Sequence, residues 1–224
     1  MEITIVDLHT RENHRESSIS KILSRYADVC TLHLFSSESS ESPFELLESC
    51  DAIVLSGSNS MKIYGDARVR GLKSILVNLA SEGVSLLGIC GGNQVLASTF
   101  GFRRFVLKEP EVGWHSIHIT EYGGSDPLFF GLKGSFLAFE SHILAVRCDD
   151  KTRVLADNEN CIQVIRYNSN TCGIQFHPEV YTRSTIDDSG KTKIDEKGDI
   201  KINTMVQENA GQRIFENFVE MTKN

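Results

Sequence analysis

Apolar runs alternate with segments of helical spacing through the first hundred residues. The runs are short, rich in Ile, Val and Leu, and bounded by polar or glycine positions, which is typical of buried strands. The predicted strands are 2–8, 29–35, 51–57 and 85–90, and the predicted helices are 17–28, 43–50 and 67–83. Alternating strands and helices predict βα units, and therefore a parallel sheet with helices on both faces.

The second half of the chain has a different pattern. Short alternating runs follow one another with turns between them and no helical spacing. These predicted strands are 103–110, 113–120, 135–144, 161–167 and 171–178. They predict an antiparallel region added to the same sheet. Residues 210–222 regain helical spacing through Ile214, Phe215, Phe218 and Met221, and we expect this helix to close the fold.

One segment departs from both patterns. Residues 183–205 are highly charged and low in large apolar side chains, so we predict a surface excursion there. Its default interpretation is a solvated loop, and a docking surface is the alternative. The chain of 224 residues otherwise has the length of one α/β domain, and we assign residues 1–224 to a single domain.

Composition excludes several classes of function. The net charge is −7 and no Lys/Arg cluster is present, which disfavours a nucleic-acid binder. No apolar run reaches the roughly 18 residues that span a bilayer, and residues 1–13 lack the pattern of a signal peptide. The six cysteines form no C-x-x-C pair, so we expect no metal site and no disulfide framework. A reduced, cytoplasmic protein with no membrane partner is the resulting expectation.

The stretch "SLLGICGGNQ" places Cys90 at the end of a predicted strand and before a predicted helix. Reactive groups gather at the carboxyl ends of strands in parallel sheets, and a sharp strand-to-helix bend projects the residue that occupies it. Gly88, Gly91 and Gly92 relieve the crowding of such a bend. The amino end of the helix favours a nucleophilic thiolate and can stabilise a negative oxygen. A cysteine between apolar residues is more often a packing residue, so this motif alone leaves both interpretations open.

A second strand end supplies a base for that thiol. The run "GIQFHPEV" ends in His177, Pro178 and Glu179. Proline restricts the preceding residue to extended backbone, where residues two apart lie on the same side. Glu179 can therefore orient His177, and His177 can activate Cys90, following the order of nucleophile, base and orienting acid.

These residues resemble the class I, or triad, glutamine amidotransferases. "GICGGNQ" (88–94) is similar to the nucleophile motif G-x-C-x-G-x-Q, and "QFHPE" (175–179) to the distal His-x-Glu motif. "IVLSGS" (53–58) resembles the loop that supplies an oxyanion amide. The segments 111–120, 126–132 and 139–142 are similar to the glutaminase domain of GMP synthetases and its stand-alone relatives. The resemblance implies an open, mostly parallel, twisted sheet of flavodoxin-like type, with helices on both faces and an added antiparallel region.

The resemblance also implies a reaction. Cys90 would attack the side-chain amide of glutamine and form a γ-glutamyl thioester, which water hydrolyses to glutamate. His177 would relay protons and Glu179 would orient it. The ammonia would pass to a partner synthetase subunit, with GMP synthesis the nearest resemblance. No cofactor is expected in this chain, since ATP and Mg²⁺ belong to the partner.

Substrate-binding roles follow from the same resemblance. The backbone amides of Ser58 and Gly91 would form the oxyanion hole. Gln94 would contact the bound glutamine, and the segment Ser141–His142 would hold its α-amino and carboxylate groups.

The sequence departs from the family at the oxyanion loop. Where the family has L-S-G-G-P, this chain has "LSGSNS", so Ser58 replaces a glycine and Asn59 a proline. A left-handed backbone at Ser58 would be strained. Two alternatives therefore stand beside the amidotransferase: a γ-glutamyl hydrolase or peptidase of the same superfamily, and a catalytically silent regulatory homologue.

Overall fold

The computed structural model describes residues 1–10, 16–36, 44–180 and 210–223. The charged excursion predicted at 183–205 lies outside these residues. Within them, nine strands form one sheet in the order β2-β1-β3-β4-β9-β8-β7-β5-β6. The strands are β1 Glu2–Asp7, β2 Asp28–His33, β3 Ala52–Leu55, β4 Ser85–Ile89, β5 Arg103–Ile119, β6 Ser135–Arg147, β7 Val154–Asp157, β8 Ile162–Asn168 and β9 Thr171–Ile174.

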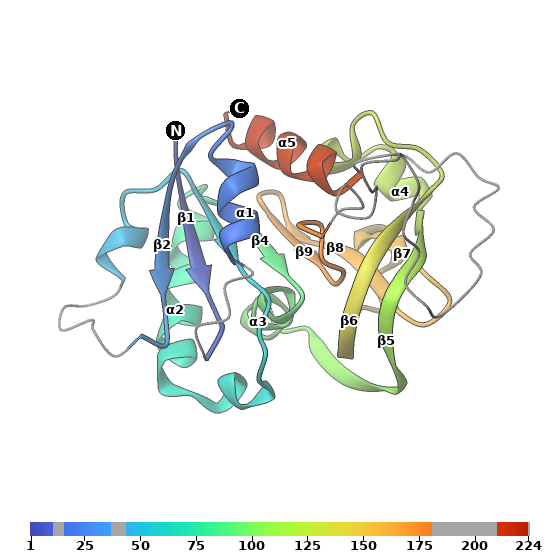
Figure 1. The fold of residues 1–224 in the computed structure, drawn as a ribbon, viewed down its shortest axis with the longest axis horizontal. Coiled ribbons are helices and arrows are strands. Elements are labelled where there is room, and N and C mark those ends of the chain that lie inside the picture. The colour runs from blue at the N-terminus through green and yellow to red at the C-terminus, as the bar shows by residue number, and fades with distance from the viewer. Residues whose placement is uncertain (11–15, 37–43, 181–209, 224) are drawn as a thin grey trace, which may run out of the picture.

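The sheet has a parallel half and an antiparallel half, as the sequence predicts, but the run 171–178, predicted in the antiparallel region, contributes β9, which pairs parallel with β4. β2, β1, β3, β4 and β9 run parallel, in the strand order of flavodoxin-like folds. From β9 onward, β8, β7, β5 and β6 pair antiparallel and extend the sheet to its other edge (Figure 1). The predicted mixed α/β fold is therefore confirmed.

Helices cover both faces of the parallel half. The described helices are α1 Glu16–Leu23, α2 Ala67–Ser81, α3 Gly91–Thr99, α4 Glu121–Gly124 and α5 Ala210–Thr222. α1 and α5 share one apolar core, which contains Ile19 and Phe215, and they lie close together in Figure 1. α2 and α3 share the other core, which contains Leu72 and Val95. Successive residues of β1, such as Ile5 and Val6, enter opposite cores because neighbouring side chains of a strand point to opposite faces.

Some element boundaries differ from the prediction. The two runs 103–110 and 113–120 form one long strand, β5, whose pairing with β6 shifts register between Val106 and Glu111. The helix predicted at 43–50 is, in its described part, only the 3₁₀ turn Glu45–Leu47. None of the described helices is long and apolar enough to cross a bilayer.

Candidate active site

Cys90 occupies a sharp bend between β4 and α3. Its backbone dihedrals are φ 49° and ψ −102°, and it is the one non-glycine residue with positive φ in the described part of the chain. Such a conformation costs an L-residue on the order of 1–3 kcal/mol and persists where the surrounding structure holds it in place. The thiol therefore lies at the amino end of α3, on the strained elbow that the glycine-flanked motif predicts.

The two glycines after Cys90 let α3 approach its neighbours closely. A Cβ on Gly91 would lie 2.7 Å from the backbone nitrogen of Ser58, and a Cβ on Gly92 would lie 2.4 Å from the carbonyl oxygen of Leu55. Neither position can hold a side chain without displacing backbone. These contacts bring the loop after β3 against the start of α3.

His177 reaches Cys90 because β9 runs parallel beside β4. The amide of Cys90 donates to the carbonyl of Ile174 at 2.7 Å, and the chain then continues for three residues to His177. The amide of His177 in turn donates to the carbonyl of Phe139 in β6 at 2.9 Å. A Cβ on Gly57 would lie 3.2 Å from Cε1 of His177 and 3.8 Å from Cβ of Cys90, so both side chains pack against this glycine.

Glu179 lies behind the imidazole, two residues along the chain. Nδ1 of His177 donates to Oε1 of Glu179 at 2.8 Å, and the two residues are 5% and 4% exposed. Burial alone lowers the pKa of His177. The carboxylate of Glu179 and a hydrogen bond with Cys90 outweigh it and raise the pKa to about 10. The three predicted triad residues therefore form a buried chain of thiol, imidazole and carboxylate.

Two backbone amides lie close together beside Cys90, that of Ser58 in the loop after β3 and that of Gly91 at the start of α3. No described residue accepts a hydrogen bond from the amide of Ser58 or of Gly91. The strain expected at Ser58 is absent, because its backbone is not left-handed. Side chains hold the altered loop instead. Ser58 Oγ accepts from the amide of Ser60 at 3.2 Å, and Asn59 Oδ1 accepts from the amide and the hydroxyl of Thr10, each at 3.1 Å.

Gln94 is buried on α3, and protein groups surround its amide. Its Nε2 donates to the carbonyl of Leu144 at 2.8 Å, and its Oε1 accepts from the hydroxyl of Tyr64. Nothing in the sequence pattern pointed to Tyr64, since it lies in a turn between β3 and α2. Contact between Gln94 and a substrate stays a prediction.

Ser141 and His142 lie on opposite faces of β6. Ser141 is exposed, whereas Nε2 of His142 is buried 3.0 Å from Oε2 of Glu111 and 3.0 Å from Oε2 of Glu140. Burial lowers the pKa of His142, but the two carboxylates raise it to about 9. The two side chains do not converge on one point, and glutamine binding by this segment stays a prediction.

Sequence reasoning missed the acidic partners of His142. The signal was present in the alternation of β6, where Phe136, Ala138, Glu140 and His142 share the buried face. A charged pair on an apolar face is unusual and indicates a built polar cluster. Glu111 faces it from β5.

An α/β fold with a strained cysteine elbow, an adjacent histidine and a carboxylate behind it defines the class of thiol-dependent hydrolases and acyl-transfer enzymes. Within that class, the chain belongs to the class I glutamine amidotransferases, because residues 14–189 match the family Glutamine amidotransferase class-I. The resemblance noted in the sequence is thereby confirmed.

Relatives in this family are named as parts of larger synthases. A glutamine-hydrolyzing GMP synthase subunit from Sulfolobus acidocaldarius is 39% identical over 103 residues, which cover 45% of this chain and 53% of that protein. The corresponding GMP synthase subunit from Methanosphaera stadtmanae is 29% identical over 185 residues, or 80% of this chain and 89% of that protein. An imidazole glycerol phosphate synthase subunit HisH from Granulibacter bethesdensis is 28% identical over 154 residues, which cover 59% of this chain and 70% of that protein.

Solved structures share the fold. A crystal structure of a putative GMP synthase subunit from Thermoplasma acidophilum superposes with a TM-score of 0.70 at 24% identity, covering 100% of this chain and 94% of that one.

Proposed function

We propose that this chain hydrolyses the side-chain amide of glutamine to glutamate and ammonia, and passes the ammonia to a partner synthetase. The observation that carries the proposal is the position of Cys90, on a strained elbow beside an imidazole that Glu179 fixes through Nδ1. Because Nδ1 is engaged by Glu179, Nε2 is the nitrogen left to serve the thiol.

The reaction has two halves. The Cys90 thiolate attacks the amide carbon, and the protonated His177 gives its proton to the departing ammonia, leaving a γ-glutamyl thioester on the sulfur. His177 then removes a proton from water, the resulting hydroxide breaks the carbon–sulfur bond, and glutamate leaves. The amides of Ser58 and Gly91, which have no acceptor among the described residues, would stabilise the oxyanion of each tetrahedral intermediate.

Substrate holding and partner coupling complete the proposal. Gln94 and the segment Ser141–His142 are assigned to the bound glutamine, the segment through the exposed Ser141, since the imidazole of His142 is buried against Glu111 and Glu140. The names of the GMP synthase relatives support a separate synthetase subunit, which would hold ATP and Mg²⁺, while this chain needs no cofactor for hydrolysis. We assign the reaction to the cytoplasm.

Labelling and product analysis test the hydrolysis. A glutamine analogue that carries an electrophile at the amide carbon is expected to add once to the protein, at Cys90, and glutamine is expected to protect against it. Glutamate release should require the same thiol. Efficient cleavage of γ-glutamyl peptides with poor glutamine hydrolysis would instead identify a γ-glutamyl hydrolase, and absence of both labelling and hydrolysis would identify a silent homologue.

The acceptor is tested by pairing. Mixed with an ATP-pyrophosphatase subunit from the same source, the chain is expected to show faster glutamate release and glutamine-dependent GMP formation. A synthetase for another acceptor that alone produces this stimulation would replace GMP synthesis in the proposal.

A further inference from the structure

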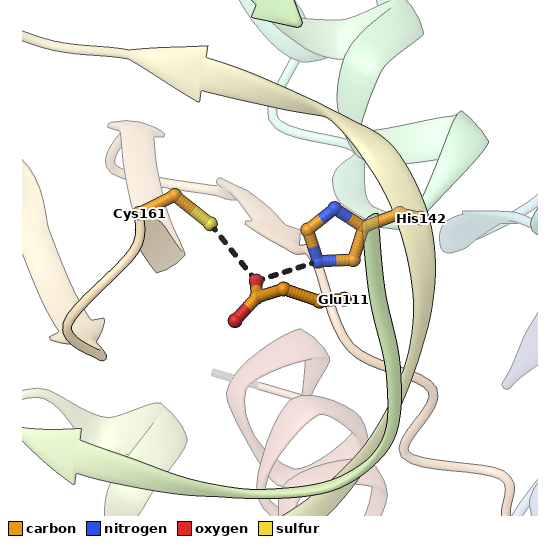
Figure 2. Close-up of side chains that lie close together, drawn as sticks. All are labelled: Glu111, His142 and Cys161. Atoms are coloured by element: carbon orange, nitrogen blue, oxygen red, sulfur yellow. Dashed lines mark hydrogen bonds and ion pairs between the residues drawn. The ribbon is translucent and has the colours of Figure 1, made fainter. Parts of the chain in front are cut away.

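A second cluster of reactive side chains lies in the antiparallel half of the sheet. Glu111 comes from β5, Glu140 and His142 from β6, and Cys161 from the residue before β8. One donor atom each from Glu111, His142 and Cys161 lies within 4.8 Å of the other two. Figure 2 shows the three side chains pointing toward one another, with Oε2 of Glu111 3.3 Å from Sγ of Cys161 and 3.0 Å from Nε2 of His142.

The orientation of His142 is fixed by its other nitrogen. Nδ1 lies 3.1 Å from the carbonyl oxygen of Leu144, which can only accept, so Nδ1 carries the hydrogen. Nε2 then faces two carboxylate oxygens, of Glu111 and Glu140, at 3.0 Å each. A positive charge has to occupy that position, and it is either a proton or a metal ion.

Glu140 shows that one proton does not satisfy the cluster. The residue is fully buried, at 0% exposure, and neither carboxylate oxygen has a hydrogen bond of acceptable geometry. A single imidazolium balances only one of the two carboxylates. Unpaired buried carboxylates are costly, whereas a divalent cation would neutralise both.

We propose that Glu111, His142 and Cys161 form a binding site for a divalent transition-metal cation of the zinc type. The ligands would be Oε2 of Glu111, Nε2 of the imidazole and Sγ of the cysteine, and the carboxylate of Glu140, 3.0 Å from Nε2, would help to balance the charge of the ion.

The donor set fits that ion. Thiolate, imidazole and carboxylate are the ligands of zinc, at about 2.0–2.3 Å, and in a tetrahedral site they lie roughly 3.3–3.6 Å from one another. Oε2 of Glu111 lies 3.0 Å from Nε2 of His142 and 3.3 Å from Sγ of Cys161, within a few tenths of an ångström of those separations, and the three donor atoms all lie within 4.8 Å of one another. Binding would release the thiol proton of Cys161 and any proton on Nε2 of His142.

The surroundings support a structural site. Outer partners orient Glu111, whose oxygens accept from Asn158 at 2.7 Å, Asn160 at 2.8 Å and Gln163 at 3.0 Å. Cys161 is only partly buried and marks the side from which an ion would enter. With ligands from β5, β6 and the residue before β8, the ion would fasten these elements together.

Cobalt binding tests the site directly. The full-length Cys90→Ala variant, which removes the other thiol–imidazole pair, is stripped with a chelator and titrated with Co²⁺. We expect one Co²⁺ per chain with a thiolate-to-cobalt charge-transfer band and tetrahedral visible bands. Adding Cys161→Ser should abolish the charge-transfer band, and adding Cys148→Ser, at a free thiol elsewhere, should leave it unchanged.

Zinc titration gives a second, independent readout. Zn²⁺ should raise the thermal midpoint of Cys90→Ala, and His142→Gln in that background should weaken Zn²⁺ binding by about 100-fold or more, beyond the cost of losing an outer partner. Absence of a thiolate band, or a band and a thermal shift that survive Cys161→Ser, would overturn the proposal and leave His142 as an imidazolium between two glutamates. The readouts are independent of glutaminase activity, so either proposal can fail alone.

Discussion

Two regions of this molecule hold the same three kinds of side chain in different arrangements. At the carboxyl ends of β4 and β9, a cysteine, a histidine and a glutamate form the row Cys90, His177 and Glu179. In the antiparallel half, Cys161 and His142 both face Glu111. Composition therefore does not distinguish a candidate nucleophile from a candidate metal ligand.

The position of the carboxylate distinguishes them. Glu179 contacts only the far side of the imidazole, so its charge favours the imidazolium without facing the sulfur. Glu111 faces the sulfur of Cys161 directly, and burial together with that charge raises the pKa of this thiol. The first arrangement stabilises the imidazolium of His177 beside Cys90, and the second suppresses a thiolate at Cys161 unless a cation is present.

Backbone geometry adds a second difference. Cys90 sits at positive φ before a helix whose first amides face it, whereas Cys161 shows no such strain. Cys161 instead donates to Glu111, and its own amide donates to Asn158 Oδ1 at 3.0 Å. A reactive thiol is thus marked by its backbone as much as by its neighbours.

The largest expected effect is the difference in glutamate release between two single variants, Cys90→Ala and Cys161→Ala. Cys90→Ala is expected to lower glutamate release by about 10³-fold or more, because no other described group can form the thioester. Cys161→Ala should keep most of the parental rate, measured below its unfolding temperature. Equal losses in the two variants would remove the distinction between the regions.

The two carboxylates should separate kcat from stability. Glu179→Gln is expected to lower kcat by about 10³-fold, since an amide cannot stabilise the imidazolium in the same way. Glu111→Gln should leave kcat nearly intact but lower the free energy of unfolding by about 2–3 kcal/mol, because the amide cannot accept all the bonds that Glu111 accepts. Steady-state kinetics and urea unfolding of both variants check this difference. A large loss of kcat in the Glu111→Gln variant would contradict it.

Removing one backbone amide should have a somewhat smaller effect. Ser58→Pro deletes the amide proposed for the oxyanion hole and should lower kcat by about 10²-fold. Ser58→Ala is the matched control, because it loses the side-chain contact with Ser60 and keeps the amide. Circular dichroism establishes that both variants are folded. A folded proline variant with full activity would exclude this amide from catalysis.

The smallest effect concerns pH and stability. The pKa of His177 rises from 6.5 to about 10 in the folded chain, because Glu179 and Cys90 outweigh its burial. The protonated ring therefore stabilises the fold fully below pH 6.5, and this contribution declines as the pH rises toward 10. The difference in unfolding free energy between the parent and His177→Gln should shrink by on the order of 2 kcal/mol between pH 6.5 and 10. A difference that grows with pH would contradict the assignment.

Much of the first region was readable in the chain. "GICGGNQ" predicts a sharp bend of the backbone, and "QFHPE" predicts an extended segment. Both conformations depend on residues adjacent in the sequence. The structure adds that β9 runs parallel beside β4, which brings both motifs to the same sheet edge because parallel strands end together. The sequence predicts that Gly91 and Gly92 relieve crowding at that bend, and the close backbone contacts at both positions confirm it.

The second region could not be predicted in the same way. Its members come from β5, β6 and the loop before β8, and they meet only because these strands pair through β7 in an order that no local pattern specifies. The pairing of β5 with β6 also shifts register between Val106 and Glu111. Simple alternation of side chains along a strand does not predict such a shift.

The sequence by itself determined the βα alternation, the cysteine elbow and the His-Pro-Glu turn, since each depends on the conformational preferences of adjacent residues. Tertiary structure alone decided which carboxylate faces which thiol, because that depends on strand order and register. Strand order and register are set by pairing between residues far apart in the sequence. They make Cys90 a candidate nucleophile and Cys161 a candidate metal ligand.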